Sequence, residues 1–250
     1  MAHILRWAAP PGAGIVASVT TTAQGGRMRL LLRTAALAAA CLMTGPLSAA
    51  ESPGLAERIA GLEPFIGAYP PSFANEAEAK VVIERYDALK RDLDAQLDKA
   101  PGDLELLFLR GELQALGHNV DRKGAWDGAT ADLQKVLRAQ PKHVPALLVL
   151  GRLWVNSRPD LAPKAENLFR AAQCFTGEQP LEEAQRGLFF TFYYQGRMQA
   201  ALQQSEYLVK TWPDDARYRS LRDTAKSVLA RQPAKPASGT LAAASPAMSS

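Results

Sequence analysis

The chain has 250 residues, of which 47% are hydrophobic, and this length suffices for one or two domains with a sizeable core. Its formal net charge of +4 comes from Arg6, Arg27, Arg29 and Arg33, because residues 1–50 contain no acidic residue. The rest of the chain holds 25 basic and 25 acidic side chains and is formally neutral. Binding to phosphates needs a basic face, so the sequence argues against a nucleic acid partner.

A secretory signal peptide is predicted over Met28–Ala50. Met28–Arg33 supplies a positively charged start, Thr34–Met43 is an apolar alanine-rich core, and small residues precede a cut ahead of Glu51. This order predicts a periplasmic or secreted mature protein without an integral membrane span. An uncleaved anchor is the competing interpretation, because the uncharged run from Thr34 to Ala50 approaches the length of a spanning helix.

Two further features of the leader concern its start and its cysteine. Residues 1–27 lack any such order, so we interpret them as an upstream extension and Met28 as the better candidate for the start. A lipoprotein signal has leucine three residues before its cysteine, whereas Ala38 precedes Cys41, so lipid anchoring at Cys41 is not expected. Cys174 is then the single cysteine of the mature chain; it cannot form an internal disulfide, and core packing is predicted for it.

Residues 51–102 read as an N-terminal helical segment. A short apolar stripe from Leu55 to Leu62 predicts a first helix before Pro64. The capping pair Asn75 and Glu78 opens a second, long amphipathic helix. Its apolar stripe requires a neighbour and consists of Val82, Tyr86, Leu89, Leu93 and Leu97.

Three helix pairs follow, each closed by a proline. The first helix of the second pair contains the pattern Leu147-x-x-Leu150-Gly151-x-x-Trp154. Its second helix carries Ala165, Phe169 and Ala172. In the third pair, a turn at Gly196 joins the two helices, Ala201 allows their close approach and Pro213 ends the second one. This spacing resembles the tetratricopeptide repeat, with its small residues, aromatic anchor and closing proline at a period of about 34 residues.

The resemblance is divergent. The steps between Gly111, Gly151 and Phe189 exceed the family's period, so insertions are expected in the loops around 117–127, 157–163 and 170–180. Arg110 and Gln114 stand where apolar residues are usual, Phe189 replaces a small residue and Ser205 replaces an aromatic one.

The resemblance implies an all-α fold in which antiparallel helix pairs stack as a right-handed superhelix, an α-α solenoid. We expect this array over 103–232, with Asp214–Arg231 as a capping helix that covers the exposed end of the stack. Residues 233–250 are rich in Pro, Ala and Ser, and we interpret them as a disordered tail.

The sequence lacks the motifs of common catalytic and cofactor sites. It contains no glycine-rich phosphate loop, no nucleophile elbow and no HExxH. His118 and His143 occur singly at helix ends, where capping or solvent exposure explains them, and no metal or cofactor is expected. The pair Glu182-Glu183 opens a helix, where negative charge stabilises the helix dipole. We therefore expect a protein that is not an enzyme.

Five aromatic residues crowd the stretch Phe189–Tyr194, more than one buried helix face can hold. Phe190, Tyr193 and Tyr194 are left over after packing, and the resemblance implies that they face the concave groove of the array. They pack beneath a neighbouring helix in the competing interpretation. With Arg186 on the same helix and Arg152 and Asn156 on the preceding unit, they form the predicted partner-binding patch.

The resemblance implies a non-catalytic scaffold or adaptor that binds a protein or peptide in its groove, and the predicted signal peptide indicates that it is exported to the cell envelope. The alternative is an envelope enzyme, or an accessory subunit of one, acting on glycan or peptide. A cleft with two carboxylates of perturbed proton affinity would favour the enzyme. A groove lined by aromatic residues and arginine would favour binding.

Maturation provides the first test. N-terminal sequencing and intact-mass measurement of the protein from the cell envelope should give a chain that begins at Glu51. A cytoplasmic protein that retains Met28 would contradict the prediction of export.

Overall fold

The computed structural model describes residues 54–231, and every regular element within that range is helical. The upstream extension, the signal peptide and the tail predicted from the sequence lie outside the described residues. The elements, in chain order, are α1 (Leu55–Ala60), α2 (Glu63–Ile66), α3 (Glu76–Lys99), α4 (Leu104–His118), α5 (Ala125–Ala139), α6 (Val144–Ser157), the 3-10 turn η1 (Pro159–Leu161), α7 (Ala162–Thr176), α8 (Glu182–Tyr194), α9 (Met198–Thr211) and α10 (Ala216–Arg231).

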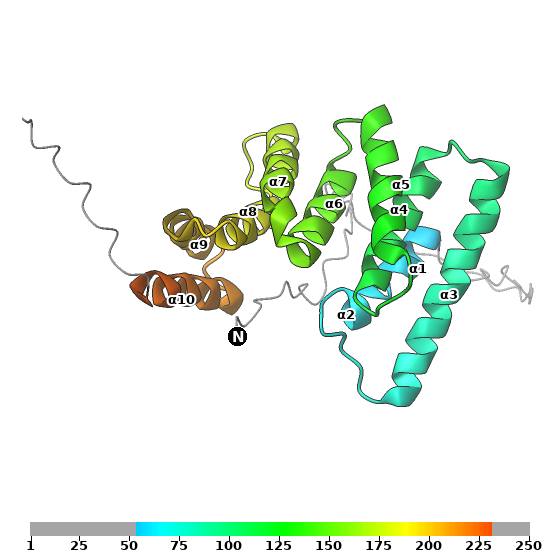
Figure 1. The fold of residues 1–250 in the computed structure, drawn as a ribbon, viewed down its shortest axis with the longest axis horizontal. Helices are drawn as coiled ribbons and strands as arrows, with labels where there is room; N and C mark the ends of the chain where they lie inside the picture. The colour runs from blue at the N-terminus through cyan, green and yellow to red at the C-terminus, as the bar shows by residue number, and fades with distance from the viewer. Residues whose placement is uncertain (1–53, 232–250) are drawn as a thin grey trace, which may run out of the picture.

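The helix pairs stack in tandem, as the sequence predicted (Figure 1). Each leading helix packs against its own partner, giving the pairs α4–α5, α6–α7 and α8–α9. The leading helices α4, α6 and α8 also contact one another in succession, and α10 packs on α9 at the end of the stack. The fold is therefore an all-α array of antiparallel helix pairs in which α4, α6 and α8 form one continuous layer.

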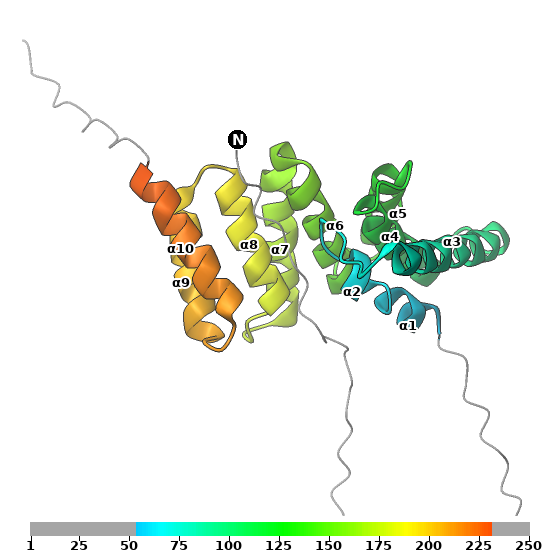
Figure 2. The same ribbon diagram turned by 90° about the horizontal axis from the view of Figure 1, so that it is seen from below.

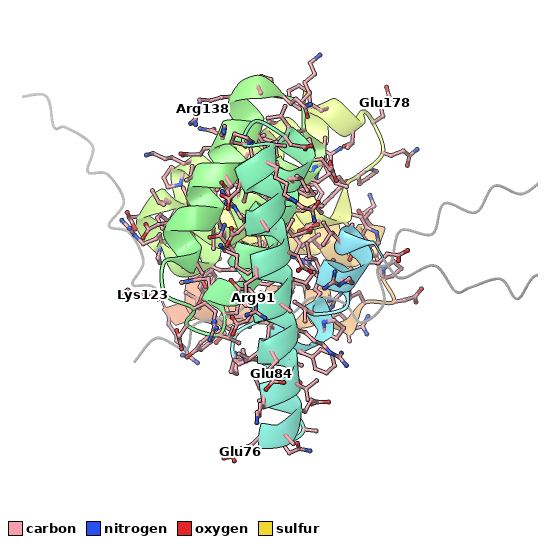
Figure 3. The ribbon with its side chains drawn as sticks, turned by 90° about the vertical axis from the view of Figure 1, so that its right-hand side faces the viewer. Glu76, Glu84, Arg91, Lys123, Arg138 and Glu178 are labelled. Carbon is pink, nitrogen blue, oxygen red and sulfur yellow. The ribbon has the colours of Figure 1, made fainter. Side chains whose placement is uncertain are left out.

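The long helix α3 forms as its capping residues dictate. The side-chain oxygen of Asn75 accepts from the backbone N–H of Glu78 at 3.0 Å, and the Glu78 carboxylate accepts from the N–H of Ala74 at 2.6 Å. The predicted stripe from Val82 to Leu97 is buried, and α3 packs on α1 and α4. Its first turns, marked by Glu76, extend beyond the rest of the molecule (Figure 3).

One aromatic ring joins two successive pairs. Phe169 of α7 is completely buried between α6 and α8, and each of those helices presents a glycine to it. A Cβ atom on Gly151 would lie 2.9 Å from the Phe169 ring, and a Cβ atom on Gly187 would lie 2.4 Å from it. These distances are too short for any side chain, so the two glycines set how closely three helices approach.

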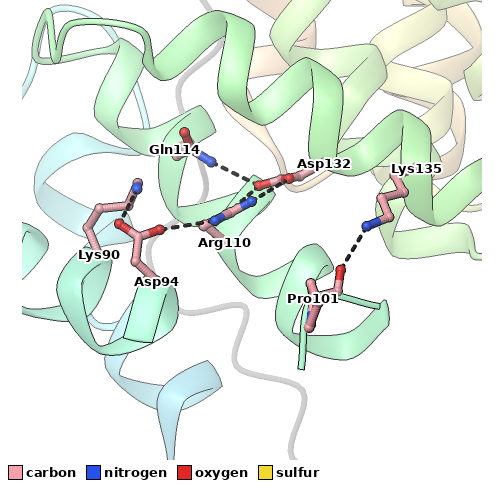
Figure 4. Close-up of polar contacts among 7 residues, drawn as sticks. All are labelled: Lys90, Asp94, Pro101, Arg110, Gln114, Asp132 and Lys135. Carbon is pink, nitrogen blue, oxygen red and sulfur yellow. Dashed lines mark hydrogen bonds and ion pairs between the residues drawn. The ribbon is translucent and has the colours of Figure 1, made fainter. Parts of the chain in front are cut away.

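Polar residues lie between α4 and α5 at positions where apolar residues are usual in the repeat pattern (Figure 4). The Arg110 guanidinium donates to both carboxylate oxygens of Asp132, at 2.7 and 2.8 Å, and to Asp94 of α3 at 3.1 Å. Gln114 donates to the same Asp132 at 3.0 Å. The Asp132 hydrogen bond is the main reason that the pKa of Arg110 lies above its ordinary value. Arg110 and Gln114, which depart from the repeat pattern, are thus hydrogen-bonded to acidic partners and connect α3, α4 and α5.

Two expectations about single residues have opposite outcomes. His143 caps α6, since its Nδ1 accepts from the backbone N–H of Ala146 at 3.1 Å. The predicted core packing of Cys174 is wrong, because this residue is exposed. The buried stripe of α7 ends at Ala172, and a residue two places further along a helix points to the opposite side.

None of the helices within residues 54–231 is both long enough and apolar enough to cross a membrane. The longest, α3, has 24 residues but carries charged side chains along most of its circumference.

The contact between Phe169 and the glycines predicts strong intolerance to added volume. Gly187→Ala should lower the free energy of unfolding by about 1–3 kcal/mol, and Gly151→Leu should do the same by overfilling the other side of the ring. Chemical denaturation followed by circular dichroism measures both. The control is Gly102→Ala, since a Cβ atom there meets nothing within 4 Å. An unchanged midpoint for Gly187→Ala would contradict the close approach of α7 and α8.

Candidate functional site

The N-terminal segment lies against the layer of leading helices (Figure 2). Ile59, Leu62 and Ile66 are fully buried there, and both α1 and α2 contact α4. The Asn119 side chain, just after α4, donates from Nδ2 to the backbone carbonyl of Ile66 at 2.8 Å. Residues 54–69 therefore pack on this layer rather than forming a separate unit, and we call the surface that they share with α4, α6 and α8 the groove.

Arg152 of α6 is the charged centre of this groove. Its side chain is 13% exposed, and its Nη1 atom lies 3.2 Å from the Glu63 carboxylate of α2 and 3.6 Å from the Glu183 carboxylate of α8. Glu112 of α4 interacts electrostatically with the same guanidinium. Three carboxylates from three helices thus surround one cation, and the local charge is negative when all of them are ionised.

Glu112 differs from the other acidic residues of the described chain. Burial raises the pKa of its carboxyl group to about 7, an effect that Arg152 partly offsets and that Glu63 and Glu183 reinforce. Its proton affinity follows from its position, because it is partly buried on α4 with more negative than positive charge around it. Glu112 is consequently the acid in the groove that changes its charge near neutral pH.

A cavity of about 370 Å³ lies next to this cluster, at the C-terminal ends of the leading helices. It is bounded by the end of α4 and the loop after it, by α6, by the loop after α2 and by the last residue of α8. Its lining combines apolar and polar side chains: Tyr69, Leu116, His118, Asn119, Asp121, Arg152, Leu153, Asn156, Ser157, Pro159 and Tyr194, together with small residues.

Most polar groups of the cavity already have partners in the protein. Ser157 accepts from the Trp126 indole N–H at 2.7 Å and donates to the Leu153 carbonyl. Arg152 is held by Glu63 and Glu183. Burial lowers the pKa of His118, a shift that the nearby Asp121 opposes, so this imidazole is neutral at pH 7.

Asn156 differs from these groups because its side chain has a buried atom without a partner in the described part of the chain. Its Oδ1 atom is buried and has no hydrogen-bond partner among the residues that the structure describes. A buried acceptor without a partner is unfavourable by about 1–3 kcal/mol, so it is a group that a ligand could satisfy.

The predicted partner-binding residues divide into two sets. Arg152, Asn156 and Tyr194 line the one cavity, although they come from different helices. Arg186 and Phe190 are only 7% and 2% exposed, so the prediction of an exposed patch on this part of α8 is wrong. Tyr193 is half-buried beside Phe189, with 6.0 Å between the ring centroids.

Both buried residues are explained by the packing around α8. This helix contacts α6, α7 and α9, and the phenol of Tyr218 in α10 donates to Glu182 at its first turn. Phe190 lies edge-on to Phe189, with ring centroids 5.2 Å apart. Periodicity identifies one buried face, but the central part of α8 is enclosed on nearly every side.

Sequence reasoning missed the acidic partners in the groove. One signal was available for Glu112, because it follows Gly111 as Arg152 follows Gly151, and equivalent positions of stacked leading helices lie on the same surface. Glu63 gave no comparable signal, since it precedes the array by many residues. Within 54–231, no group of three or more His, Cys, Asp and Glu side chains is placed to hold a metal ion.

Comparisons with known proteins give partial similarities. No protein-family model matches the chain. Over 95 residues it is 32% identical to "FK506-binding protein-like" of Homo sapiens, and this stretch is 38% of the chain but only 26% of that relative. The Rattus norvegicus protein of the same name matches to the same extent. A thermophilic TPR protein of Thermus thermophilus is 18% identical, with a TM-score of 0.47 over 59% of this chain and 76% of that one.

The raised pKa of Glu112 predicts how stability depends on pH. A carboxyl group that binds its proton more tightly in the folded state stabilises the fold at low pH, and that contribution is lost as the pH rises from about 4.5 to about 7. Glu112→Gln should remove this loss and make the variant more stable than the parent at about pH 8, by on the order of 1–3 kcal/mol.

Denaturation at several pH values measures this effect. Glu206→Gln is the control, since it removes an exposed carboxylate from α9, outside the charges that act on Glu112, and should leave the pH dependence of stability unchanged. Parallel stability curves for the parent and Glu112→Gln between about pH 5 and about pH 8 would contradict the assignment.

Proposed function

We propose that the protein is an exported, non-catalytic scaffold of the cell envelope, which holds a segment of a partner protein in the groove along α4, α6 and α8. The observation that carries this proposal is the cavity at the C-terminal ends of these helices, where Asn156 presents an unsatisfied buried acceptor. Clefts with apolar walls and a few unpaired polar groups are the usual sites of ligand recognition.

The arrangement of the groove supports a binding role. The wall is built from rigid helices, and its central charge, Arg152, is fixed by carboxylates of two neighbouring elements. Such a wall keeps its shape before a ligand arrives, which lowers the entropy lost on binding. The exported part of the proposal is supported by the order of the leader sequence, residues 28–50.

The alternative of an envelope enzyme requires a pair of carboxylates with altered proton affinity. Glu112 is the one carboxyl group within 54–231 whose pKa is clearly raised, and Arg152 lies beside it. A single enclosed acid lacks the second group that general acid–base chemistry on glycan or peptide needs. The geometry therefore favours binding over catalysis.

Site-specific photo-crosslinking tests the location of the groove. A benzophenone amino acid at Tyr69, which lines the cavity and is 43% exposed, should form discrete adducts with a partner in the cell envelope. The same amino acid at Tyr207, 38% exposed on α9 and away from the cavity, should not form them. Equal adducts at both positions, or adducts at Tyr207 alone, would contradict the assignment of the groove.

A further inference from the structure

We propose that the cavity takes a cationic side chain, a lysine or an arginine, from an extended basic segment of the partner protein. This inference rests on the proposed function and names the chemistry that the groove recognises.

Two groups of the cavity can accept hydrogen bonds from a ligand, one buried and one exposed. Asn156 offers its buried Oδ1 atom. Asp121, at the turn after α4, offers a carboxylate that makes no ion pair or side-chain hydrogen bond within the described chain. The neighbouring cation Arg122 is held by Asp87 instead. A ligand that fits these groups must donate hydrogen bonds, as an ammonium or a guanidinium does.

The charges deeper in the groove point the same way. Arg152 is surrounded by Glu63, Glu112 and Glu183, so its charge is already neutralised. Glu183 also interacts with Arg186, so the cluster carries a net negative charge only when Glu112 is ionised. In that state an acidic ligand would be repelled and a cation would be attracted.

The remaining walls suit the body of a long basic side chain. Tyr69 and Tyr194 contribute aromatic rings, while Leu116, Leu153 and Pro159 contribute apolar surface. Lysine and arginine bury their aliphatic stems against apolar groups, and their charged ends are favourable near the faces of tyrosine rings. Acceptors, negative charge and two phenol rings therefore occur together in one cavity.

Three short peptides test this chemistry directly. They are acetylated and amidated alanine pentapeptides whose central residue is arginine, norleucine or glutamate. The Trp126 indole N–H, which donates to Ser157 in the cavity wall at 2.7 Å, provides an NMR signal that reports binding. We expect the arginine peptide to bind about tenfold more tightly than the norleucine peptide, and the glutamate peptide to bind least.

Substitutions at Asn156 and Asp121 test whether the arginine peptide binds in this cavity. Asn156→Leu and Asp121→Asn should each weaken the arginine peptide by about threefold or more, and Asn156→Asp should strengthen it, because it adds negative charge at the same place. Asparagine suits the positive φ of 55° at position 121, so the turn is preserved. Glu178→Gln, which removes a carboxylate at the other end of the helices, is the control (Figure 3).

The outcomes separate the two proposals. Equal binding of the arginine and norleucine peptides, or a gain for the glutamate peptide, overturns the cationic ligand while leaving the groove intact. An unchanged affinity in all three variants, with the thermal midpoints unaltered, places the arginine elsewhere and also overturns the inference. If no peptide binds and the benzophenone at Tyr69 forms no adduct, the groove itself is not the binding site.

Discussion

The fit of Phe169 between two glycines is the constraint on which the array depends. Because neither Gly151 nor Gly187 has a side chain, α6 and α8 both pack directly against the ring on α7, and two successive helix pairs share one buried residue. The spacing of α6 and α8, which are two of the three helices of the layer, follows from this contact. Close packing of this kind transmits a small displacement at one pair to the next.

The first pair adds charges to a similar close approach, in which a Cβ atom on Gly111 would lie 2.8 Å from Leu133. Arg110 bridges Asp94 and Asp132 across three helices. A partly buried ion pair adds little net stability compared with an apolar core, but it tolerates few relative orientations of the helices that carry it. Arg152 plays a similar part on the groove side, where it fixes Glu63 and Glu183 from two separate helices. In this chain, ion pairs therefore link neighbouring helices both between α3, α4 and α5 and between α2, α6 and α8.

The fold was largely predictable because the repeat encodes it locally. The spacing from Leu147 to Trp154 and the small residue at Ala201 specify how one helix meets the next, and the structure confirms this arrangement. Which neighbours surround each helix was less predictable. Phe190 and Arg186 were expected to be exposed, but the helices around α8 cover them. Cys174 was expected in the core but lies on the exposed side of α7. The carboxylates around Arg152 escaped prediction because no local pattern links residues so distant in the chain.

The contact between Glu63 and Arg152 also bears on the order in which the molecule forms. Their sequence separation is 89 residues, whereas the helix pairs contact chiefly their immediate neighbours along the chain. Contacts between neighbours involve short loops and form early, while closure of a long loop has a higher entropic cost. Docking of α1 and α2 should accordingly be a late event in folding, and their backbone amides should exchange with solvent sooner than those of α6 and α7. The groove would then acquire its acidic wall only after the stack that supports it is complete.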